Sequence, residues 1–366
     1  MRILHINAGL EQGGGLFHIV NLLKVARLEQ QDFTLLTFAD GPVAAEARKV
    51  GAKVDVLGID SRYDLRLLQK LKRYINKGNF DIVHTHGARA NLFMSMISGQ
   101  IPAKWVITVH SDPTKDFGGR GFVGRVFTKL NLRSLRKADR LLAVTQNFKN
   151  LLVQQVQVDP AHISVIYNGI FFDQDEKKQL QHAGFNIINV ARMEPIKGQM
   201  LLLQALSELK LADLKLHFVG DGSALQELKE YVKAHGMNEN VVFHGFLPQS
   251  AINDLYQTMD LAVLTSYSES FPLVLLEAAN AEVPILSTNV GDIEKMIPDE
   301  QHGFVASIGD GGSIKNAILK AYSIHKEQPS TLNEMAQIEK SYLSANFSMV
   351  QQLNSIESIY RALLNN

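Results

Sequence analysis

Short apolar segments alternate with amphipathic stretches along the whole chain, and this alternation limits the possible folds more than any other feature. The apolar segments begin at residues 2, 32, 53, 80, 104, 139 and 162, and again at 184, 213, 240, 260, 283 and 302. Apolar strands separated by helices are typical of parallel sheets that are covered on both faces. The sequence therefore predicts an α/β protein built from parallel sheets.

A polar stretch without clear periodicity, residues 171–183, separates the two series of segments. We interpret it as a domain boundary, because 366 residues are enough for two domains. We expect one Rossmann-like domain over residues 1–170 and a second over residues 171–347. Asp173 and Asp175 have the spacing of a metal-binding D-x-D pair, but in this polar stretch we interpret them as solvated carboxylates.

The composition excludes several classes of protein. The chain contains no cysteine, so a disulfide framework, a thiolate metal site and a catalytic thiol are excluded. It has no run of eighteen apolar residues, so no membrane-spanning helix is expected. The first residues, MRILHINAG, enter a strand directly and do not resemble a signal segment. We therefore expect a cytoplasmic location.

Charge is distributed unevenly between the halves of the chain. Residues 1–180 contain 25 Lys and Arg against 16 Asp and Glu, a formal charge of +9, and residues 181–366 contain 12 against 21, a formal charge of −9. Such asymmetry suggests that the halves meet different partners, an anionic membrane or acceptor for the basic half. Mutual attraction between two domains explains the same asymmetry equally well.

The basic charge is concentrated in residues 120–140, which have the pattern of a helix. Its cations are Arg120, Arg125, Lys129, Arg133, Arg136, Lys137 and Arg140. Val123, Val126, Phe127 and Leu130 share one face of this helix, and cations surround that face. This pattern is typical of a helix at an anionic membrane surface, and also of an ordinary amphipathic helix packed on its own sheet. Nucleic acid is not an expected partner, because the net charge is zero and no aromatic residues are interleaved across a sheet.

Ligands of open parallel sheets bind beyond the carboxyl ends of the strands, where His86 and His110 are expected. His110 ends the strand WVITVH before a glycine-bearing loop, and it is either a site residue or a structural histidine. We expect His84 and His86, in VHTHG, to point in different directions, His84 into the core and His86 toward the ligand. A metal pair is therefore not expected. The turn Gly13–Gly15, between a strand and a helix, allows backbone to approach a phosphate.

Two carboxylates and two cations stand at the ends of strands in the second half. The stretch Thr265–Glu282 reads as a polar loop followed by a helix from Pro272, with Glu269 in the loop and Glu277 in the helix. A helix start suits a phosphate, and flanking carboxylates suit hydroxyl-rich groups. Arg192 and Lys197 lie five residues apart, where they can hold a diphosphate without a metal ion.

These residues resemble a known family. The segment ESFPLVLLEA, residues 269–278, resembles the E-x7-E signature of the retaining nucleotide-sugar glycosyltransferases of glycosyltransferase family 4, also called glycosyl transferases group 1. The segment ARMEPIKG resembles the family's G-R-L-x-x-x-K-G, with Ala191 and Met193 as departures, and Gly13–Gly15 resembles its glycine loop. The resemblance implies the GT-B arrangement, in which two Rossmann-like domains face a cleft and the terminal helix, residues 348–366, packs back on the first domain.

The resemblance also implies roles for individual residues. Arg192 and Lys197 would neutralise the leaving diphosphate, Glu269 would bind the donor sugar, and His110, from the T-x-H pattern, would face the transferred sugar. The remaining donor-binding residues would be Gly14, Gly15, Gly222, Phe246, Leu247, Leu273, Val274 and Glu277. No metal and no cofactor are expected. Pro272 stands where many members have glycine, and it removes one N–H donor from the helix start.

The predicted activity is that of a retaining hexosyltransferase. It would move a sugar from a nucleotide diphosphate, UDP in most similar proteins, to a hydroxyl acceptor that can be lipid-linked, in polysaccharide or glycoconjugate synthesis. No carboxylate stands out as a nucleophile of the glycosidase type, so a front-face path assisted by the leaving phosphate is favoured. A membrane-binding helix would place the enzyme at the inner face of the membrane. Two alternatives remain: a UDP-sugar 2-epimerase of the same fold, and a non-catalytic sugar-binding partner of a synthase complex.

Overall fold

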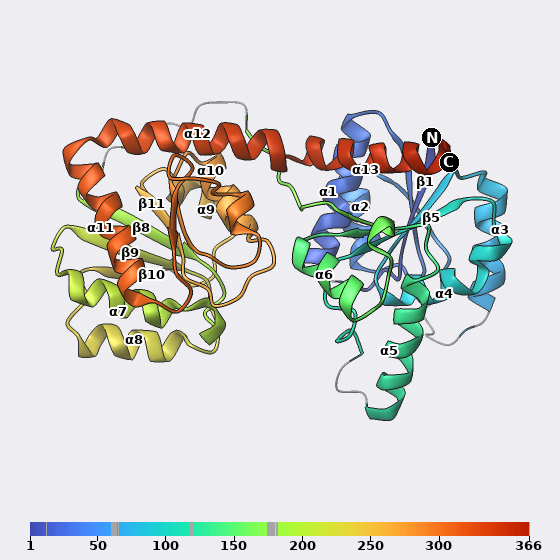
Figure 1. Cartoon of the computed structure of the whole chain (residues 1–366), viewed down its shortest axis with the longest axis horizontal. Coiled ribbons are helices and arrows are strands. Elements are labelled where there is room, and N and C mark those ends of the chain that lie inside the picture. Colours follow the sequence, from blue (N-terminus) through green and yellow to red (C-terminus); the bar gives the residue numbers. More distant parts are fainter. Residues whose placement is uncertain are drawn as a thin grey trace. The chain divides into compact units, whose positions relative to one another are not determined.

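The computed structural model describes residues 1–11, 13–59, 64, 66–117, 121–173, 180 and 182–365, and these form two compact units (Figure 1). Unit 1 contains residues 1–168 and 349–366, and unit 2 contains residues 169–348. Arg120 and Asp175, for which the sequence suggested roles, lie outside the described residues. Within the described part of the chain, none of the helices combines the length and the apolar character that crossing a membrane requires.

Unit 1 is built on a seven-stranded parallel sheet. Its strands are β1 (Arg2–Asn7), β2 (Asp32–Thr37), β3 (Lys53–Val56), β4 (Ile82–His86), β5 (Lys104–Val109), β6 (Arg140–Ala143) and β7 (Ile163–Val165). They are arranged in the order β3-β2-β1-β4-β5-β6-β7, and every pair is parallel. Parallel neighbours require long crossovers, which the helices between the strands supply.

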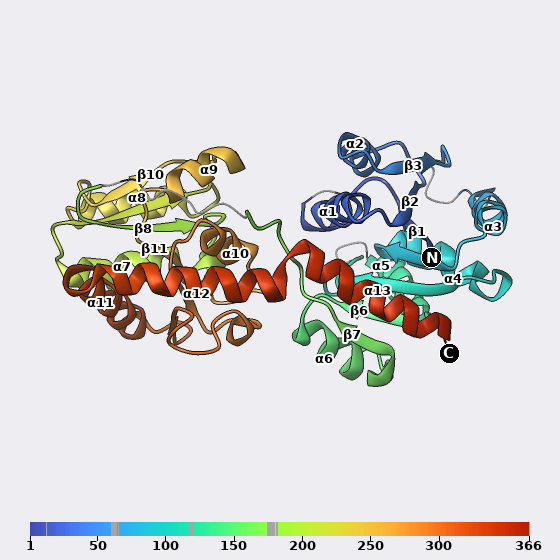
Figure 2. The same cartoon turned by 90° about the horizontal axis from the view of Figure 1, so that it is seen from above.

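Helices cover both faces of this sheet. They are α1 (Gly14–Leu28), α2 (Pro42–Lys49), α3 (Arg66–Gly78), α4 (Ala88–Ile97), α5 (Gly121–Leu135), α6 (Gln146–Gln154) and the terminal α13 (Met349–Asn365), with short 3-10 turns at Ser98–Gln100 and Pro160–His162. The terminal helix lies over the sheet beside α1, while α4 packs between α3 and α5 (Figures 1 and 2). Side chains that alternate along each strand therefore enter one of two separate layers.

Unit 2 repeats this plan with six parallel strands in the order β10-β9-β8-β11-β12-β13. The strands are β8 (Phe185–Val190), β9 (Leu214–Val219), β10 (Val241–Phe243), β11 (Leu261–Leu264), β12 (Ile285–Thr288) and β13 (Phe304–Ala306). The helices are α7 (Gln199–Leu209), α8 (Leu225–Ala234), α9 (Gln249–Tyr256), α10 (Leu273–Asn280), α11 (Gly311–Glu327) and α12 (Pro329–Phe347), with 3-10 turns at Pro195–Lys197 and Ile293–Lys295. The predicted fold class, α/β with two parallel sheets, is confirmed.

The stretch of residues 195–209, which has the apolar pattern of one helix, is interrupted at Gly198. Pro195–Lys197 form a 3-10 turn, Gly198 is left-handed with φ +68°, and α7 begins at Gln199. A Cβ atom at Gly198 would lie 2.1 Å from the carbonyl oxygen of Thr265. The backbones of these two loops touch, and only glycine permits both this contact and this conformation.

Candidate functional site

The donor-side residues predicted from the sequence lie at the carboxyl ends of four adjacent strands of unit 2. Phe246 follows β10, Gly222 follows β9, Arg192 and Lys197 follow β8, and Glu269 follows β11. This edge of the sheet is where open parallel sheets bind their ligands. Strand order therefore brings together residues that are up to 77 positions apart in the sequence.

Lys197 and Glu269 contact each other directly. Lys197 Nζ donates to Glu269 Oε1 over 2.6 Å, and the two side chains are 17% and 13% exposed. The hydroxyl of Ser266 donates to the same carboxylate oxygen over 2.7 Å. From the sequence, Lys197 was expected to bind the diphosphate and Glu269 the donor sugar. In the structure the two side chains contact and orient each other. A partly buried ion pair of this kind holds both charges in fixed positions.

Backbone contacts fix the loop that carries Lys197. The hydroxyl of Thr265 is 3.2 Å from the carbonyl oxygen of Lys197 and 3.1 Å from that of Gly198, and it can donate to either. The N–H of Tyr267 donates to the carbonyl oxygen of Ile196 over 2.9 Å. The loops after β8 and β11 are thus joined on both sides of the Lys197–Glu269 pair.

Gly222 and its neighbour Gly220 have a packing role that their sequence pattern did not predict. Cβ atoms at these two positions would lie 2.3 Å from the carbonyl oxygen of Met193 and 2.0 Å from that of Ala191. The N–H of Met193 also donates to the carbonyl oxygen of Asp221 over 2.9 Å. The glycine loop therefore holds the loop of Arg192, whose side chain is exposed, against the sheet edge.

Glu277 is half-buried at the fifth residue of α10, one position earlier than expected because Pro272 precedes the helix and does not begin it. Burial raises the pKa of its carboxyl group, and a hydrogen bond from the Gln249 side chain opposes that shift. Leu273 and Val274 form the first turn of α10, where the N–H groups have no acceptor within the helix. The helix start and a carboxylate one turn later are therefore close together.

Phe246 and Leu247 follow β10 in a loop that adjoins the glycine loop. The N–H of Gly220 donates to the carbonyl oxygen of Gly245 over 2.8 Å, which ties the two loops together. The side chain of Phe246 is 82% exposed, and Leu247 is half-buried. An exposed aromatic ring at this edge of the sheet is available to stack on a planar ligand.

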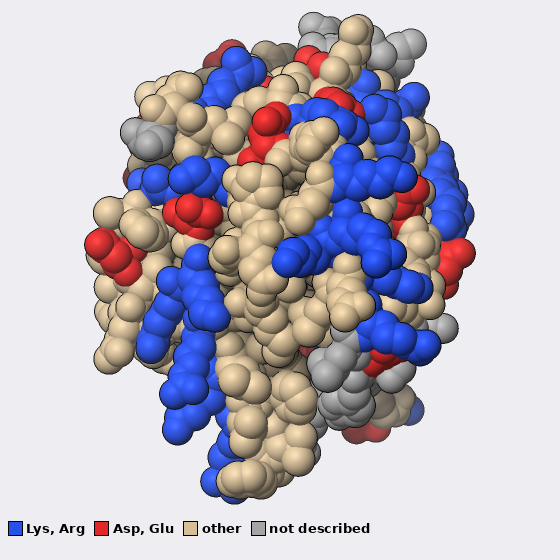
Figure 3. Space-filling model, turned by 90° about the vertical axis from the view of Figure 1, so that its right-hand side faces the viewer, with Lys and Arg blue, Asp and Glu red and all other residues tan. Residues whose placement is uncertain are grey.

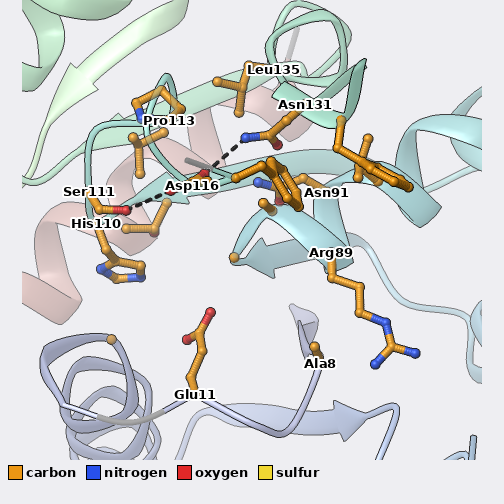
Figure 4. Close-up of a pocket in the computed structure, with 18 of the residues that line it drawn as sticks. Ala8, Glu11, Arg89, Asn91, His110, Ser111, Pro113, Asp116, Asn131 and Leu135 are labelled. Carbon is orange, nitrogen blue, oxygen red and sulfur yellow. Dashed lines mark hydrogen bonds between the residues drawn. The ribbon is translucent and has the colours of Figure 1, made fainter. Parts of the chain in front are cut away.

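Gly14 and Gly15, predicted to bind the donor, and His110, predicted to face the transferred sugar, lie in unit 1 and line a cavity of about 920 Å³ (Figure 4). Gly14 and Gly15 of α1, His110 after β5 and Asn168 lie in its wall. Burial lowers the pKa of His110 well below its usual value, so the imidazole is neutral at pH 7. Two further carboxylates in the wall, Glu11 and Asp116, were missed by the sequence analysis. The position of Glu11 just before the Gly13–Gly15 turn was the available signal.

The expectation about His84 and His86 is wrong. Residues two apart in a strand share a face, and their rings stack with centroids 4.4 Å apart. His84 contacts the Tyr360 hydroxyl of α13 over 2.5 Å through Nδ1 and the Thr108 hydroxyl over 2.7 Å through Nε2. His86 lies 3.0 Å from His5 through Nε2 and 3.3 Å from His110 through Nδ1. Three strands thus contribute to one network of buried histidines.

Two sets of three histidines in this network have the spacing of metal ligands. They are His5, His84 and His86, and His18, His86 and His110, with one ring nitrogen of each residue within 4.8 Å of the others. Both nitrogens of His84 already contact hydroxyl groups, and His18 Nδ1 contacts Asn168 Oδ1 over 2.8 Å. The arrangement is that of a neutral hydrogen-bonded network within the layer beneath α1 and α13.

Two family profiles match the chain, one after the other. Residues 12–174 match Glycosyltransferase Family 4, and residues 171–340 match Glycosyl transferases group 1. UDP-Gal:alpha-D-GlcNAc-diphosphoundecaprenol alpha-1,3-galactosyltransferase of Escherichia coli is 24% identical over 81% of this chain and 79% of its own length. N-acetyl-alpha-D-glucosaminyl L-malate synthase of Bacillus anthracis is 26% identical over 74% of each.

Solved structures show the same fold. A glycosyltransferase from Rickettsia africae ESF-5 has a TM-score of 0.81 at 20% identity, over 100% of this chain and 99% of that one. Anabaena HepE in complex with UDP has a TM-score of 0.79 at 19% identity, over 99% and 100%. The two sheets of this chain are therefore the two domains of the GT-B fold.

Proposed function

The chain belongs to the glycosyl transferases group 1, enzymes that transfer a sugar from a nucleotide sugar, and from this premise we propose that its donor is a UDP-sugar and that it transfers the sugar with retention to a hydroxyl acceptor. The observation that carries the proposal is the convergence of Arg192, the Lys197–Glu269 pair and Glu277 at one edge of unit 2. Anabaena HepE, of the same fold, binds UDP and UDP-glucose. The E. coli relative uses UDP-Gal.

In this proposal unit 2 holds the donor. Arg192 and Lys197 neutralise the charge that develops on the leaving diphosphate, where fixed charges lower a barrier most. Glu269 orients Lys197 and accepts from hydroxyl groups of the sugar. Glu277 accepts from the ribose hydroxyls, and the ring of Phe246 stacks on the base. Metal ions have no role in this scheme, because the two cations supply the compensating charge.

Unit 1 holds the acceptor in this proposal. His110 and the glycine turn at Gly14 and Gly15 line its cavity, and the neutral imidazole of His110 can donate or accept one hydrogen bond. The leaving phosphate assists deprotonation of the acceptor hydroxyl, so the new bond forms on the face that the diphosphate leaves. The anomeric configuration is then retained. The role is in polysaccharide or glycoconjugate synthesis, the field of the relatives.

The substitution Glu277→Gln tests the donor assignment. We expect wild-type protein to bind UDP in calorimetry and the variant to bind about 10- to 100-fold more weakly, because one charge-assisted acceptor is lost at constant shape. Binding by the wild type should weaken as the pH falls toward the raised pKa of Glu277, since the protonated carboxyl cannot accept from both hydroxyls. Glu239→Gln, in the exposed turn before β10, is the control.

Turnover tests the reaction itself. UDP-, GDP- and ADP-sugars are offered with and without acceptor, and the products are followed by NMR. We expect UDP consumption to depend on acceptor and the new linkage to keep the anomeric configuration of the donor. A changed free sugar formed without acceptor would indicate a 2-epimerase, and weak UDP binding that is indifferent to Glu277 would indicate a non-catalytic partner.

We also propose that α5 binds an anionic membrane surface. Its buried positions are Gly124, Asn131, Ser134 and Leu135, whereas Phe122, Val123, Val126 and Leu130 are 74%, 55%, 41% and 38% exposed. A helix that only packed on its own sheet would bury those apolar residues. Figure 3 shows many Lys and Arg and fewer acidic side chains on the face of unit 1 that it views. Apolar residues bordered by cations suit anionic headgroups.

Liposome flotation tests this surface. We expect Lys129→Glu combined with Arg133→Glu to reduce partition into vesicles with anionic lipid by about 30-fold or more, because each cation near the surface contributes about 1 kcal/mol. The matched control is Lys229→Glu with Lys233→Glu, an exposed pair at the same spacing on α8 of unit 2. Equal recovery of wild type and variant with anionic and neutral vesicles would refute the membrane surface.

A further inference from the structure

The cavity of unit 1 has a polar mouth and an apolar interior. Its interior lies between α4 and α5 and is lined by Leu92, Phe93, Met96, Phe127, Leu130 and Leu135. The mouth lies at the carboxyl ends of β1 and β5, where the side chains of Glu11 and His110 point toward each other (Figure 4). A volume of about 920 Å³ exceeds what a single monosaccharide fills, and most of the side chains that α4 and α5 contribute to the wall are apolar.

Two buried acceptor atoms in this wall lack partners. Glu11 Oε2 and Asn131 Oδ1 are both buried, and neither has a hydrogen-bond partner among the described residues. Asn131 is 1% exposed, and its Nδ2 donates to Asp116 Oδ2 over 3.0 Å, which fixes the direction of the amide. A buried acceptor without a partner is costly, so a ligand that supplies donors there is strongly favoured.

The two acceptor atoms, Glu11 Oε2 and Asn131 Oδ1, favour a ligand group that donates hydrogen bonds. Hydroxyl groups can donate to Glu11 and Asn131, whereas a phosphate offers further acceptors and is repelled by the carboxylates of Glu11 and Asp116. Burial raises the pKa of both carboxyl groups, and each would gain a hydrogen bond from a hydroxyl donor. Arg89, the one cation that the described residues contribute to the wall, points away from this pair over the rings of Phe38 and Phe93 (Figure 4).

Two glycines leave room for the carboxylate of Glu11. A Cβ atom at Gly87 would lie 2.2 Å from Glu11 Oε1, and one at Gly15 would lie 3.0 Å from Oε2. Gly87 has φ +87°, so both its conformation and this contact require glycine. The side chain of Glu11 is therefore held in one place at the mouth, as is required of a group that binds a ligand hydroxyl specifically.

The apolar interior also reaches the protein surface along α5. Leu130 and Met96 line the cavity and are nevertheless 38% and 53% exposed. Phe117 borders both this cavity and a second hollow of about 570 Å³ under Phe122 and Val126. An apolar chain that enters beside Leu130 thus stays in contact with apolar side chains from the surface to the mouth.

We propose that the acceptor is an amphiphile, with hydroxyl groups held by Glu11 at the mouth and by Asn131 beside Asp116, and with an uncharged apolar portion between α4 and α5. This inference rests on the proposed function, because it assigns the acceptor of that reaction. It adds the class of acceptor, a glycoside or alcohol whose apolar portion is joined to the hydroxyl-bearing head without a phosphate.

Binding of alkyl glycosides to the whole chain, measured without donor, tests this proposal separately from catalysis. Methyl, butyl, hexyl and octyl glucosides and galactosides are titrated below their micellar concentrations and followed by saturation-transfer NMR. We expect affinity to rise roughly 3- to 4-fold with each added methylene until the interior is filled. Affinity that is independent of chain length, or tighter binding when a phosphate joins the chain to the sugar, would overturn the proposal.

Matched variants locate the bound chain. Leu130→Asp should abolish the dependence on chain length, whereas Val123→Asp, on the exposed side of α5 and outside the cavity wall, should preserve it. Equal losses in both variants would show that the glycosides bind to the surface of the helix, and the proposal would fail. The conservative variant Leu130→Met should keep the dependence of affinity on chain length that Leu130→Asp loses.

Glu11→Gln tests the head group. We expect about a tenfold rise or more in the acceptor KM, with UDP affinity and the chain-length dependence unchanged, and no change in Glu46→Gln, whose side chain is 42% exposed on α2. An unchanged KM would remove Glu11 from the acceptor site. If UDP binds normally and the glycosides do not bind, the acceptor assignment fails while the proposed function stands. If UDP does not bind, the proposed function fails first.

Discussion

Lys197→Ala is expected to lower kcat by about 10²- to 10³-fold, the cost typical of removing one fixed group aimed at developing charge. Lys197 is 17% exposed and held by Glu269 at 2.6 Å, so its ammonium group is already in place before a leaving diphosphate forms. Arg192→Ala should have an effect of similar size, because both cations neutralise the charge that develops on the leaving diphosphate. Steady-state kinetics with saturating UDP-sugar measure both.

Folding effects can be separated from this loss. Removing Lys197 leaves the carboxylate of Glu269 with the Ser266 hydroxyl as its partner, which also destabilises unit 2. The double variant Lys197→Ala with Glu269→Gln removes that unpaired charge, so it should regain thermal stability without regaining turnover. Lys233→Ala, on the exposed face of α8, is the matched control. Near-normal turnover of Lys197→Ala would rule the cation out as the group that stabilises the leaving phosphate.

Unit 1 is expected to unfold in mild acid. Burial lowers the pKa of His5 to about 3 and of His18 to about 4, and it holds those of His84, His86 and His110 well below their usual value. The unfolded chain takes up protons at these sites from about pH 6.5 downward while the folded chain does not. The contribution of these histidines to the free energy of unfolding is therefore fully present above about pH 6.5, and it is lost as the pH falls toward their pKa values in the folded chain.

The expected effect is large because the five sites act together. Between pH 6.5 and 5.5 each site lowers the free energy of unfolding by about 1 kcal/mol, because the unfolded histidine is already half protonated at pH 6.5, and the five sites together lower it by roughly 5 kcal/mol. A domain is typically stable by about 5–15 kcal/mol, and unit 1 should therefore unfold near pH 5.

Tryptophan fluorescence reports on unit 1 alone. The single tryptophan of the chain, Trp105, is 1% exposed on β5. Urea unfolding between pH 7.5 and 5 should show steep loss of stability, and His5→Gln should reduce the slope by about one proton. The control His235→Gln, at the exposed end of α8, should leave the slope unchanged. A urea midpoint that does not change across this pH range would show that the buried histidines are not held neutral in the folded chain.

Much of the fold follows from local patterns. The thirteen strands of the described residues all lie within the apolar segments identified in the sequence, and helices separate most of them as the parallel order requires. The family could likewise be recognised from short motifs, because Arg192, Lys197, Glu269 and Glu277 each keep a fixed place relative to a strand end or helix start. The error at His84 and His86 came from assigning opposite faces to residues that share one.

The sequence alone determined which residues stand at the carboxyl ends of the strands, because strand and helix periodicity are local properties. Only the tertiary structure decided what those residues touch. The pairing of Lys197 with Glu269, the seating of Glu11 against Gly87, the histidine network and the cavity between α4 and α5 all join segments that are distant in sequence. Contacts of this kind depend on strand order and on how side chains pack between layers, and neither is encoded in any single segment.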